Sequence, residues 1–171
     1  MCYLYQEQHE KRFIPSMVNI NAEFVNPFLE AASAVFKSIL NVDLRRGKLV
    51  IKESPIPSLD VAILIGITGG VTGEVVYSMG YNMAYKIAET LVPGLTEQQM
   101  KQEYKDVMGE MANMITGNAM NLFATTGKRI NMTTPTVVEG KDFTITLIKQ
   151  TTLGINLYSP MGQLEMNVAL K

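Results

Sequence analysis

"LDVAILIGITGGVTGEVVYS", residues 59–78, is the stretch that decides the fold. It begins with an apolar, β-branched run that is typical of a buried strand. The glycines that follow turn the chain sharply, and "EVVYS" then continues as a second strand. These glycines lack the Lys-Ser/Thr ending of a phosphate-binding loop, and a strand rather than a helix comes after them. The stretch therefore predicts a β-hairpin.

Upstream of the hairpin, the sequence predicts one helix and one strand. Apolar residues recur at three- and four-residue spacing up to about Leu40, and Asn21 or Asn26 can cap the start of this helix. Pro27 must then lie in the first turn or at a kink. Residues 47–53, "GKLVIKE", alternate between apolar and polar side chains, as a strand does.

Downstream of the hairpin, the sequence predicts a short helix and then the longest element of the chain. Residues 80–94 have apolar side chains at four-residue spacing and stop at a Pro-Gly pair, as expected for a helix end. Thr96 and Gln99 form a capping box, and the apolar stripe after them continues to Gly127. The stripe comprises residues 100, 104, 107, 108, 111, 114, 115, 119, 122 and 123. This helix would contain about 30 residues and extend roughly 45 Å.

Four β-rich runs follow the long helix: "TPTVVEG", "DFTITLIK", "TLGINLYS" and "QLEMNVAL". Short polar or turn segments separate them, so they predict a meander of antiparallel strands. The whole order of elements indicates an α/β fold of the α+β type, in which a mostly antiparallel sheet is covered by long helices. The twelve methionines are interpreted as adaptable core filler.

Length and charge exclude several classes of protein. At 171 residues, with 47% apolar and 18% charged residues, the chain is long enough for one domain with a sizeable core. The formal net charge is −1 and no basic run is longer than Arg45-Arg46, which argues against nucleic acid or a membrane surface as the partner. No apolar run reaches the roughly 18 residues that span a bilayer. We therefore expect a cytoplasmic protein.

Residues 1–16 are interpreted as an N-terminal extension, either disordered or introduced during cloning, before a second plausible start at Met17. The domain would then comprise residues 17–171. The extension holds the one cysteine, Cys2, and the one histidine, His9, so neither an internal disulfide nor a transition-metal cluster is expected. A domain without histidine also lacks the usual base of a hydrolase triad.

The long predicted helix carries a polar stripe opposite its apolar one. Its members fall at steps of three or four residues and are Glu103, Asp106, Glu110, Asn113 and Gly117. The simplest interpretation is the solvent side of an amphipathic helix, and a functional site is the other. Spacing alone does not decide between them, because Glu23-Phe-Val-Asn26 repeats the same Glu-x-x-Asn pair.

Two details favour a function. Asn is a poor residue for a helix interior, yet Asn113, Asn118 and Asn121 stand together in one third of this helix. Gly109 and Gly117 flank the Glu-Asn pair, and each lowers helix stability by roughly 1 kcal/mol relative to Ala. Small residues at these positions would let another backbone approach closely.

The pattern resembles the CheC/CheX/FliY family of chemotaxis phosphatases, and CheX most closely. The resemblance rests on Asp106-x-x-x-Glu110-x-x-Asn113, on Pro135 in "TPTVVEGKDF" at about the family's spacing, and on the hairpin "IGITGGVTGEVVYS". It covers nearly the whole domain. It implies an antiparallel sheet with two long helices on one side, and dephosphorylation of a CheY-like response regulator that is phosphorylated on aspartate.

The resemblance also implies roles for single residues. Glu110 would pair with the active-site lysine of the partner, and Asn113 would orient the attacking water as a glutamine does in GTPases. Asp106 would steer a basic rim or hold the helix face, and Pro135 would shape the start of the strand beside the helix. This chain would bind no metal or cofactor, because Mg²⁺ would be held by the regulator.

The resemblance further implies a homodimer whose sheets join edge to edge, so an exposed strand among the last four is the expected joining edge. The other pair, Glu23 and Asn26, is followed at once by Pro27 and has Asn19 in the leading position, so no second site is expected. Two alternatives remain open. One is an adaptor that binds a regulator or a flagellar motor component without hydrolysis, and the other is a structural dimerisation domain with the Glu-Asn face buried at a subunit interface.

Overall fold

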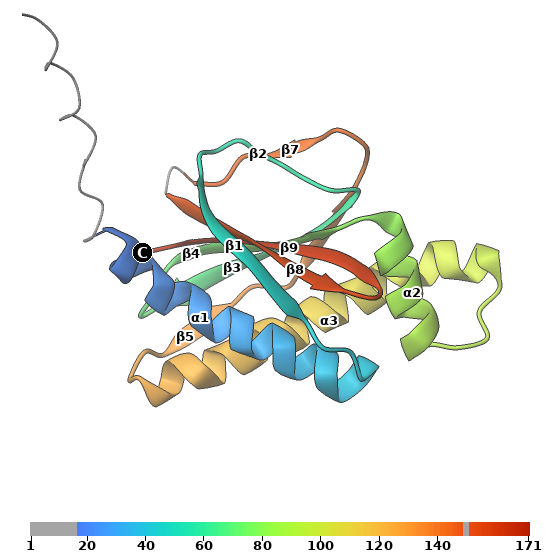
Figure 1. The fold of residues 1–171 in the computed structure, drawn as a ribbon, viewed down its shortest axis with the longest axis horizontal. Coiled ribbons are helices and arrows are strands. Elements are labelled where there is room, and N and C mark those ends of the chain that lie inside the picture. The colour runs from blue at the N-terminus through green and yellow to red at the C-terminus, as the bar shows by residue number, and fades with distance from the viewer. Residues whose placement is uncertain (1–16, 149–150) are drawn as a thin grey trace, which may run out of the picture.

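The chain forms three layers: two long helices, a seven-stranded sheet and a small two-stranded arm (Figure 1). The computed structural model describes residues 17–148 and 151–171, so the predictions about residues 1–16, Cys2 and His9 lie outside the described residues. The two long helices lie on one face of the sheet and the arm lies over the other (Figure 1). The predicted α+β fold, with a mostly antiparallel sheet covered by long helices, is confirmed.

The predicted hairpin is confirmed and lies inside the main sheet. Strand β3 (Val61–Gly69) pairs antiparallel with β4 (Gly73–Met79). The turn depends on Gly73, because its φ is 144° and a Cβ there would lie 1.9 Å from the carbonyl oxygen of Ala169. A left-handed backbone that approaches another strand so closely requires a glycine.

Five further strands complete the main sheet. They are β1 (Arg45–Lys52), β5 (Ile130–Met132), β6 (Thr136–Glu139), β8 (Thr152–Ser159) and β9 (Gly162–Leu170). The order across the sheet is β1-β8-β9-β4-β3-β5, with β6 also paired to β3, and every pairing is antiparallel. One edge of the sheet is therefore β1, the strand predicted at residues 47–53, and the other edge is β5 with β6.

The prediction of a four-stranded meander is wrong. β8 and β9 do form a hairpin, but β6 pairs with β3, and β7 (Thr144–Ile145) pairs with β2 (Ile56–Pro57) in the separate two-stranded arm. The alternation in residues 142–149 marks one apolar side correctly, since Ile145 and Leu147 are buried against the back of the main sheet. Alternation shows that one side of a strand is buried and does not show which element buries it. The short β5 was not predicted, because three residues carry too little alternation.

The first helix begins earlier than predicted. α1 (Met17–Val35) continues into one turn of π-helix, η1 (Phe36–Leu40), so the predicted end of the helix is confirmed. Asn21 and Asn26 lie inside the helix and are not caps, and Pro27 also lies inside rather than in the first turn. Burial of the apolar side of the helix against the rest of the chain offsets the loss of the backbone hydrogen bond that proline cannot donate. The buried residues of this side are Val25, Phe28, Leu29, Ala31, Ala32 and Val35.

The other two helices agree with the sequence patterns. α2 (Tyr81–Leu91) is followed by α3 (Glu97–Thr125), which has 29 residues. The predicted capping box is present, because the backbone N–H of Gln99 donates to Thr96 Oγ1 at 3.3 Å and that of Thr96 donates to Gln99 Oε1 at 2.9 Å. Both caps satisfy donors that the first turn would otherwise leave free.

α3 lies beside α1 under the sheet (Figure 1), where the rings of Phe28 and Phe123 meet edge to face with centroids 5.7 Å apart. The buried side of α3 consists of Tyr104, Met108, Met111, Ala112, Ile115, Thr116, Ala119 and Phe123. The predicted stripe was too wide: Met114 is 36% exposed, and Val107 is only partly buried. These two positions flank the buried side of the helix, where the sheet and α1 no longer cover it.

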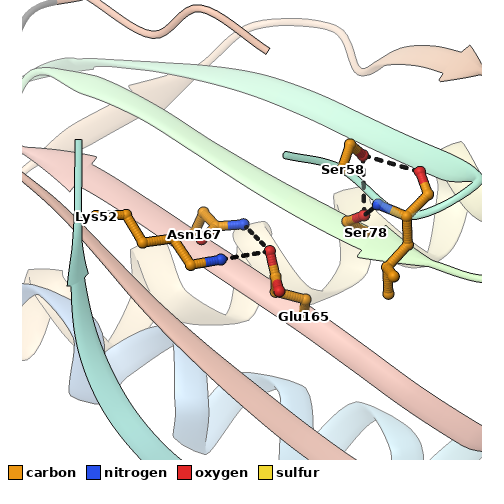
Figure 2. Close-up of polar contacts among 6 residues, drawn as sticks. Lys52, Ser58, Ser78, Glu165 and Asn167 are labelled. Carbon is orange, nitrogen blue, oxygen red and sulfur yellow. Dashed lines mark hydrogen bonds and ion pairs between the residues drawn. The ribbon is translucent and has the colours of Figure 1, made fainter. Parts of the chain in front are cut away.

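Polar side chains link strands on the face of the sheet away from the helices (Figure 2). Lys52 Nζ on β1 lies 2.7 Å from Glu165 Oε1 on β9, and Asn167 Nδ2 donates to the same oxygen at 2.8 Å. Nearer the arm, the hydroxyls of Ser58 and Ser78 lie 3.0 Å apart. All five side chains are at least partly buried, so these contacts connect strands rather than line an open site.

Candidate functional site

The polar stripe predicted on α3 forms a ridge on the solvent side of the helix. Glu103, Asp106 and Glu110 are exposed along it, and Asn113 is half-buried. Steps of three and four residues place these side chains one above another. The helix thus brings the predicted acid and amide together on one accessible line, in front of a buried side that contacts the sheet.

The carboxylates of Asp106 and Glu110 are not neutralised by neighbours in the described part of the chain. The nearest lysines in the sequence are already paired: Lys101 Nζ lies 2.8 Å from Glu97, and Lys105 Nζ lies 2.6 Å from Glu139. Two exposed anions without a cation partner raise the negative potential at this point of the ridge. The ridge is therefore suited to a cationic group from another molecule.

One polar atom of the Asn113 amide is buried without a hydrogen-bond partner in the described residues. Its Oδ1 is buried and accepts no hydrogen bond from residues 17–148 or 151–171. A buried carbonyl left without a partner costs about 1–3 kcal/mol. The terminal torsion of an asparagine is soft, so the group can turn and present either its carbonyl or its NH2 outward. Because the buried Oδ1 lowers stability, this amide is better explained by a contact with another molecule than by a role in the fold.

Gly109 lies beside Pro135 and β6, whereas Gly117 faces open space. A Cβ at Gly109 would lie 3.7 Å from Val137 Cγ2 and 4.0 Å from Pro135 Cβ, so Pro135 stands beside α3 just before β6. A Cβ at Gly117 would have no atom of the described residues within 4 Å. Neither glycine is required by the packing of this chain itself. Their roles stay predictions, and the open space at Gly117 agrees with a close approach by another molecule.

A groove of about 290 Å³ lies beside the ridge, between the end of α2 and α3. Its lining consists of Leu91, Val92, Val107, Met111 and Met114, together with Asp106 and Glu110. The sequence patterns did not indicate this groove, because two of its five apolar residues, Leu91 and Val92, come from the end of α2 and the residue after it. The one indication in the sequence was that the apolar stripe on α3 is wider than its buried side. Val107 and Met114 belong to the stripe but remain at least partly exposed.

The second Glu-x-x-Asn pair differs from the first in its surroundings. Glu23 and Asn26 are both exposed on α1, but the carboxylate of Glu23 contacts Lys128 Nζ, which also lies 5.0 Å from the ring centroid of Phe24. Glu23 is thus engaged within the chain, in contrast to Glu110. The side chain of Asn19 lies outside the described residues.

Within residues 17–148 and 151–171, no three His, Cys, Asp or Glu side chains gather closely enough to hold a metal ion. In the same part of the chain, no helix is long and apolar enough to cross a membrane.

A sheet covered by two long helices is the fold of several solved chemotaxis proteins. The structure of chemotaxis protein CheX from Desulfovibrio desulfuricans has this fold, with a TM-score of 0.80 and 24% identity over 87% of this chain and 99% of that chain. The family model "Chemotaxis phosphatase CheX" matches residues 61–155, which is more than half of the sequence. The chain belongs to the CheX family, and the predicted resemblance is confirmed.

Two further relatives are a CheY-P phosphatase and a CheX solved in complex with CheY. The CheY-P phosphatase CheX of Thermotoga maritima is 29% identical over 127 residues, which cover 74% of this chain and 81% of that protein. The CheX in the CheX-CheY-BeF3-Mg²⁺ complex from Borrelia burgdorferi shares the fold, with a TM-score of 0.74 and 24% identity over 86% of this chain and 97% of that chain.

Proposed function

We propose that this chain hydrolyses the aspartyl phosphate of a CheY-like response regulator, with residues 17–171 acting as one CheX-like domain in the cytoplasm. Membership of the CheX family supports the phosphatase role, and the Borrelia complex of a CheX with CheY supports the kind of partner. One observation carries the assignment of the site. On the exposed ridge of α3, the carboxylate of Glu110 stands one turn before the amide of Asn113, and within the described residues neither this carboxylate nor Asn113 Oδ1 has a partner.

Asn113 would position the attacking water. An acyl phosphate is already labile, so an enzyme needs mainly to hold a water in line with phosphorus and exclude other geometries. A carboxamide suits this task, because its carbonyl accepts a bond from water while its NH2 donates to a phosphoryl oxygen, and it does not titrate. Turning the Asn113 amide outward would present both groups to the partner.

Glu110 would fix the position of the two proteins relative to each other. Its carboxylate would pair with the active-site lysine of the regulator, which determines where Asn113 enters the partner's site. Asp106 would add negative charge that steers a basic rim, and Pro135 would hold the start of β6 against α3. Mg²⁺ held by the regulator would neutralise charge on the phosphoryl group.

An adaptor without catalysis is the second candidate. The observation that favours it is the buried Oδ1 of Asn113, because the carbonyl in this orientation does not reach a water in a partner's site. An adaptor would need only the acids of the ridge. The two candidates differ in what Asn113→Ala does to turnover.

We also propose a homodimer joined through a sheet edge. Among the last four strands, β8 and β9 are paired on both sides, so only β6 remains at an edge of the main sheet. The opposite edge, β1, has eight residues and exposes Ile51 at 59%. An apolar side chain on a long free edge favours pairing with a second strand, so β1 is the better joining edge.

The deciding experiment follows the loss of phosphate from a panel of CheY-like regulators labelled with acetyl [³²P]phosphate, with and without this protein. The wild-type chain should accelerate the loss from at least one regulator. Asn113→Ala should abolish the acceleration while binding to the beryllofluoride-loaded regulator is retained, and Glu110→Ala should weaken binding as well. Retained turnover in Asn113→Ala would overturn the mechanism, and binding without any acceleration by the wild type would establish the adaptor.

A further inference from the structure

The groove between α2 and α3 exposes apolar side chains beside the candidate site. Leu91 and Val92 contribute from the end of α2 and the residue after it, and Val107 and Met114 contribute from α3. Met111 also lines the groove but is buried. Val92 is 39% exposed and Met114 is 36% exposed. Large apolar side chains that gather on a concave surface, rather than scattering singly, mark a contact site. Methionine is suited to such a surface, because its flexible side chain adapts to different partners.

The groove also has a charged wall. Asp106 and Glu110 line it together with the apolar residues, and no lysine or arginine in the described part of the chain pairs with either carboxylate. An apolar floor next to two uncompensated anions is complementary to a large apolar side chain that has a lysine or arginine beside it.

The groove is continuous with the acid–amide ridge through Glu110. At about 100° per residue, Asn113 lies about 60° to one side of Glu110 and Met114 about 40° to the other side. The rise along the helix from Glu110 to Asn113 is about 4.5 Å. A protein that takes Asn113 into its active site must therefore also lie over or beside the groove.

We propose that the groove binds a surface segment of the response regulator in which a large apolar side chain stands next to a lysine or arginine. This inference rests on the proposed function and extends it, because it assigns binding of the partner to residues outside the acid–amide pair. Glu110 and Asn113 would act at the partner's active site, whereas the apolar floor would contact a side chain outside that site. The groove therefore contributes to the affinity for the regulator.

The test compares two groove variants, Met114→Ala and Val92→Ala, with a matched control, Ile148→Ala. Ile148 is a more exposed apolar residue, 64% exposed, that follows the arm strand β7 at the other face of the sheet. Turnover of a regulator phosphorylated with acetyl phosphate is measured over a range of regulator concentrations. Each groove variant should raise KM about tenfold and leave kcat within about twofold. The reason is that it removes an interaction that stabilises the bound substrate and the transition state equally. The control should change neither.

Failure of this inference is distinguishable from failure of the proposed function. If the wild type accelerates phosphate loss and both groove variants keep its KM, the groove assignment is wrong and the phosphatase stands. If the wild type has no activity, affinity for the beryllofluoride-loaded regulator still tests the groove: about a tenfold weaker affinity in the groove variants supports it, and unchanged affinity overturns it.

Crosslinking identifies the occupant directly. Met114→Cys in a Cys2→Ser background carries one thiol, to which a benzophenone maleimide is attached, because Cys2 is the one natural cysteine. Irradiation with the purified, beryllofluoride-loaded regulator should label a single peptide that contains a large apolar residue beside a lysine or arginine. Labelling of a second copy of this chain instead, or of a regulator peptide without a basic residue, would overturn the proposal.

Discussion

The hydroxyl oxygens of Tyr77 and Thr116 lie 2.9 Å apart in the buried core, where they connect β4 of the hairpin to α3. Both side chains are fully buried. Thr116 follows Asn113 by three residues, so this one hydrogen bond helps to fix the part of α3 that carries the candidate site. A buried pair of this kind stabilises modestly when complete and destabilises when one half is removed.

We expect Thr116→Val to destabilise the fold by about 1–3 kcal/mol, because it keeps the shape of the side chain and leaves the Tyr77 hydroxyl buried without a partner. Chemical denaturation measures the loss. The double variant Tyr77→Phe, Thr116→Val is the control, since it removes both hydroxyls and should recover part of the stability. If the double variant is less stable than Thr116→Val by the full effect of Tyr77→Phe, the two hydroxyls do not act as a pair.

Stability should fall at alkaline pH through the same tyrosine. Burial raises the pKa of the Tyr77 hydroxyl well above its ordinary value, and the hydrogen bond with Thr116 opposes this only in part. Below about pH 10, Tyr77 is protonated in both the folded and the unfolded chain and contributes no pH dependence. Above that pH, the unfolded chain loses the proton while the folded chain keeps it, so the free energy of unfolding decreases as pH rises.

Denaturation between pH 9 and 11 tests this expectation. The wild type should lose up to about 1.4 kcal/mol per pH unit more than Tyr77→Phe, which has no such proton. The pKa of the Tyr81 hydroxyl is also raised, chiefly by desolvation. That contribution is present in both proteins and cancels in the comparison. Equal slopes for the two proteins would show that the Tyr77 hydroxyl is not protected in the folded state.

The polar network on the back of the sheet should support stability and not catalysis (Figure 2). Glu165→Ala leaves Lys52 Nζ and Asn167 Nδ2 without the oxygen that both contact, and Lys52 lies across Gly154, where a Cβ would be 2.6 Å from its Cε. We expect a loss of about 1–3 kcal/mol in the free energy of unfolding, with kcat and KM unchanged. Glu97→Ala is the control, because its pair with Lys101 is exposed to solvent and should contribute much less to stability. Equal effects of the two substitutions would contradict a structural role for the network.

The parts of the fold that could be predicted from sequence are those set by local chemistry. The hairpin depends on Gly73 and its neighbours in the chain, and the start of α3 depends on Thr96 and Gln99, three residues apart. Pairing between distant segments could not be predicted in this way. β6 meets β3 only after α3 has crossed the sheet, and nothing in "TPTVVEG" indicates its partner.

The same distinction between local chemistry and contacts of distant segments applies to the candidate site. Asp106, Glu110 and Asn113 share a helix face, so helical periodicity is enough to predict that they lie together. The groove could not be predicted, because Val92, just after α2, and Met114 on α3 are far apart in the sequence and line one groove only in the folded chain. The cap of α2 was missed for the same reason: Asp60 Oδ2, which accepts from the backbone N–H of Tyr81 at 3.1 Å, comes from the segment before β3.

Gly117→Ala should separate stability from activity. A methyl group at this position meets no atom of residues 17–148 or 151–171 within 4 Å, so the substitution should raise the free energy of unfolding by about 1 kcal/mol, as for an exposed glycine inside a helix. The same methyl stands one turn after Asn113, where we expect a partner to approach the backbone closely, so kcat/KM should fall severalfold. Gly109→Ala is the control: its methyl would make an ordinary contact, 3.7 Å from Val137 Cγ2, and would face β6. Both variants should therefore gain stability, and only Gly117→Ala should lose activity. A Gly117→Ala protein with full activity would show that the glycine does not serve a close approach at the site.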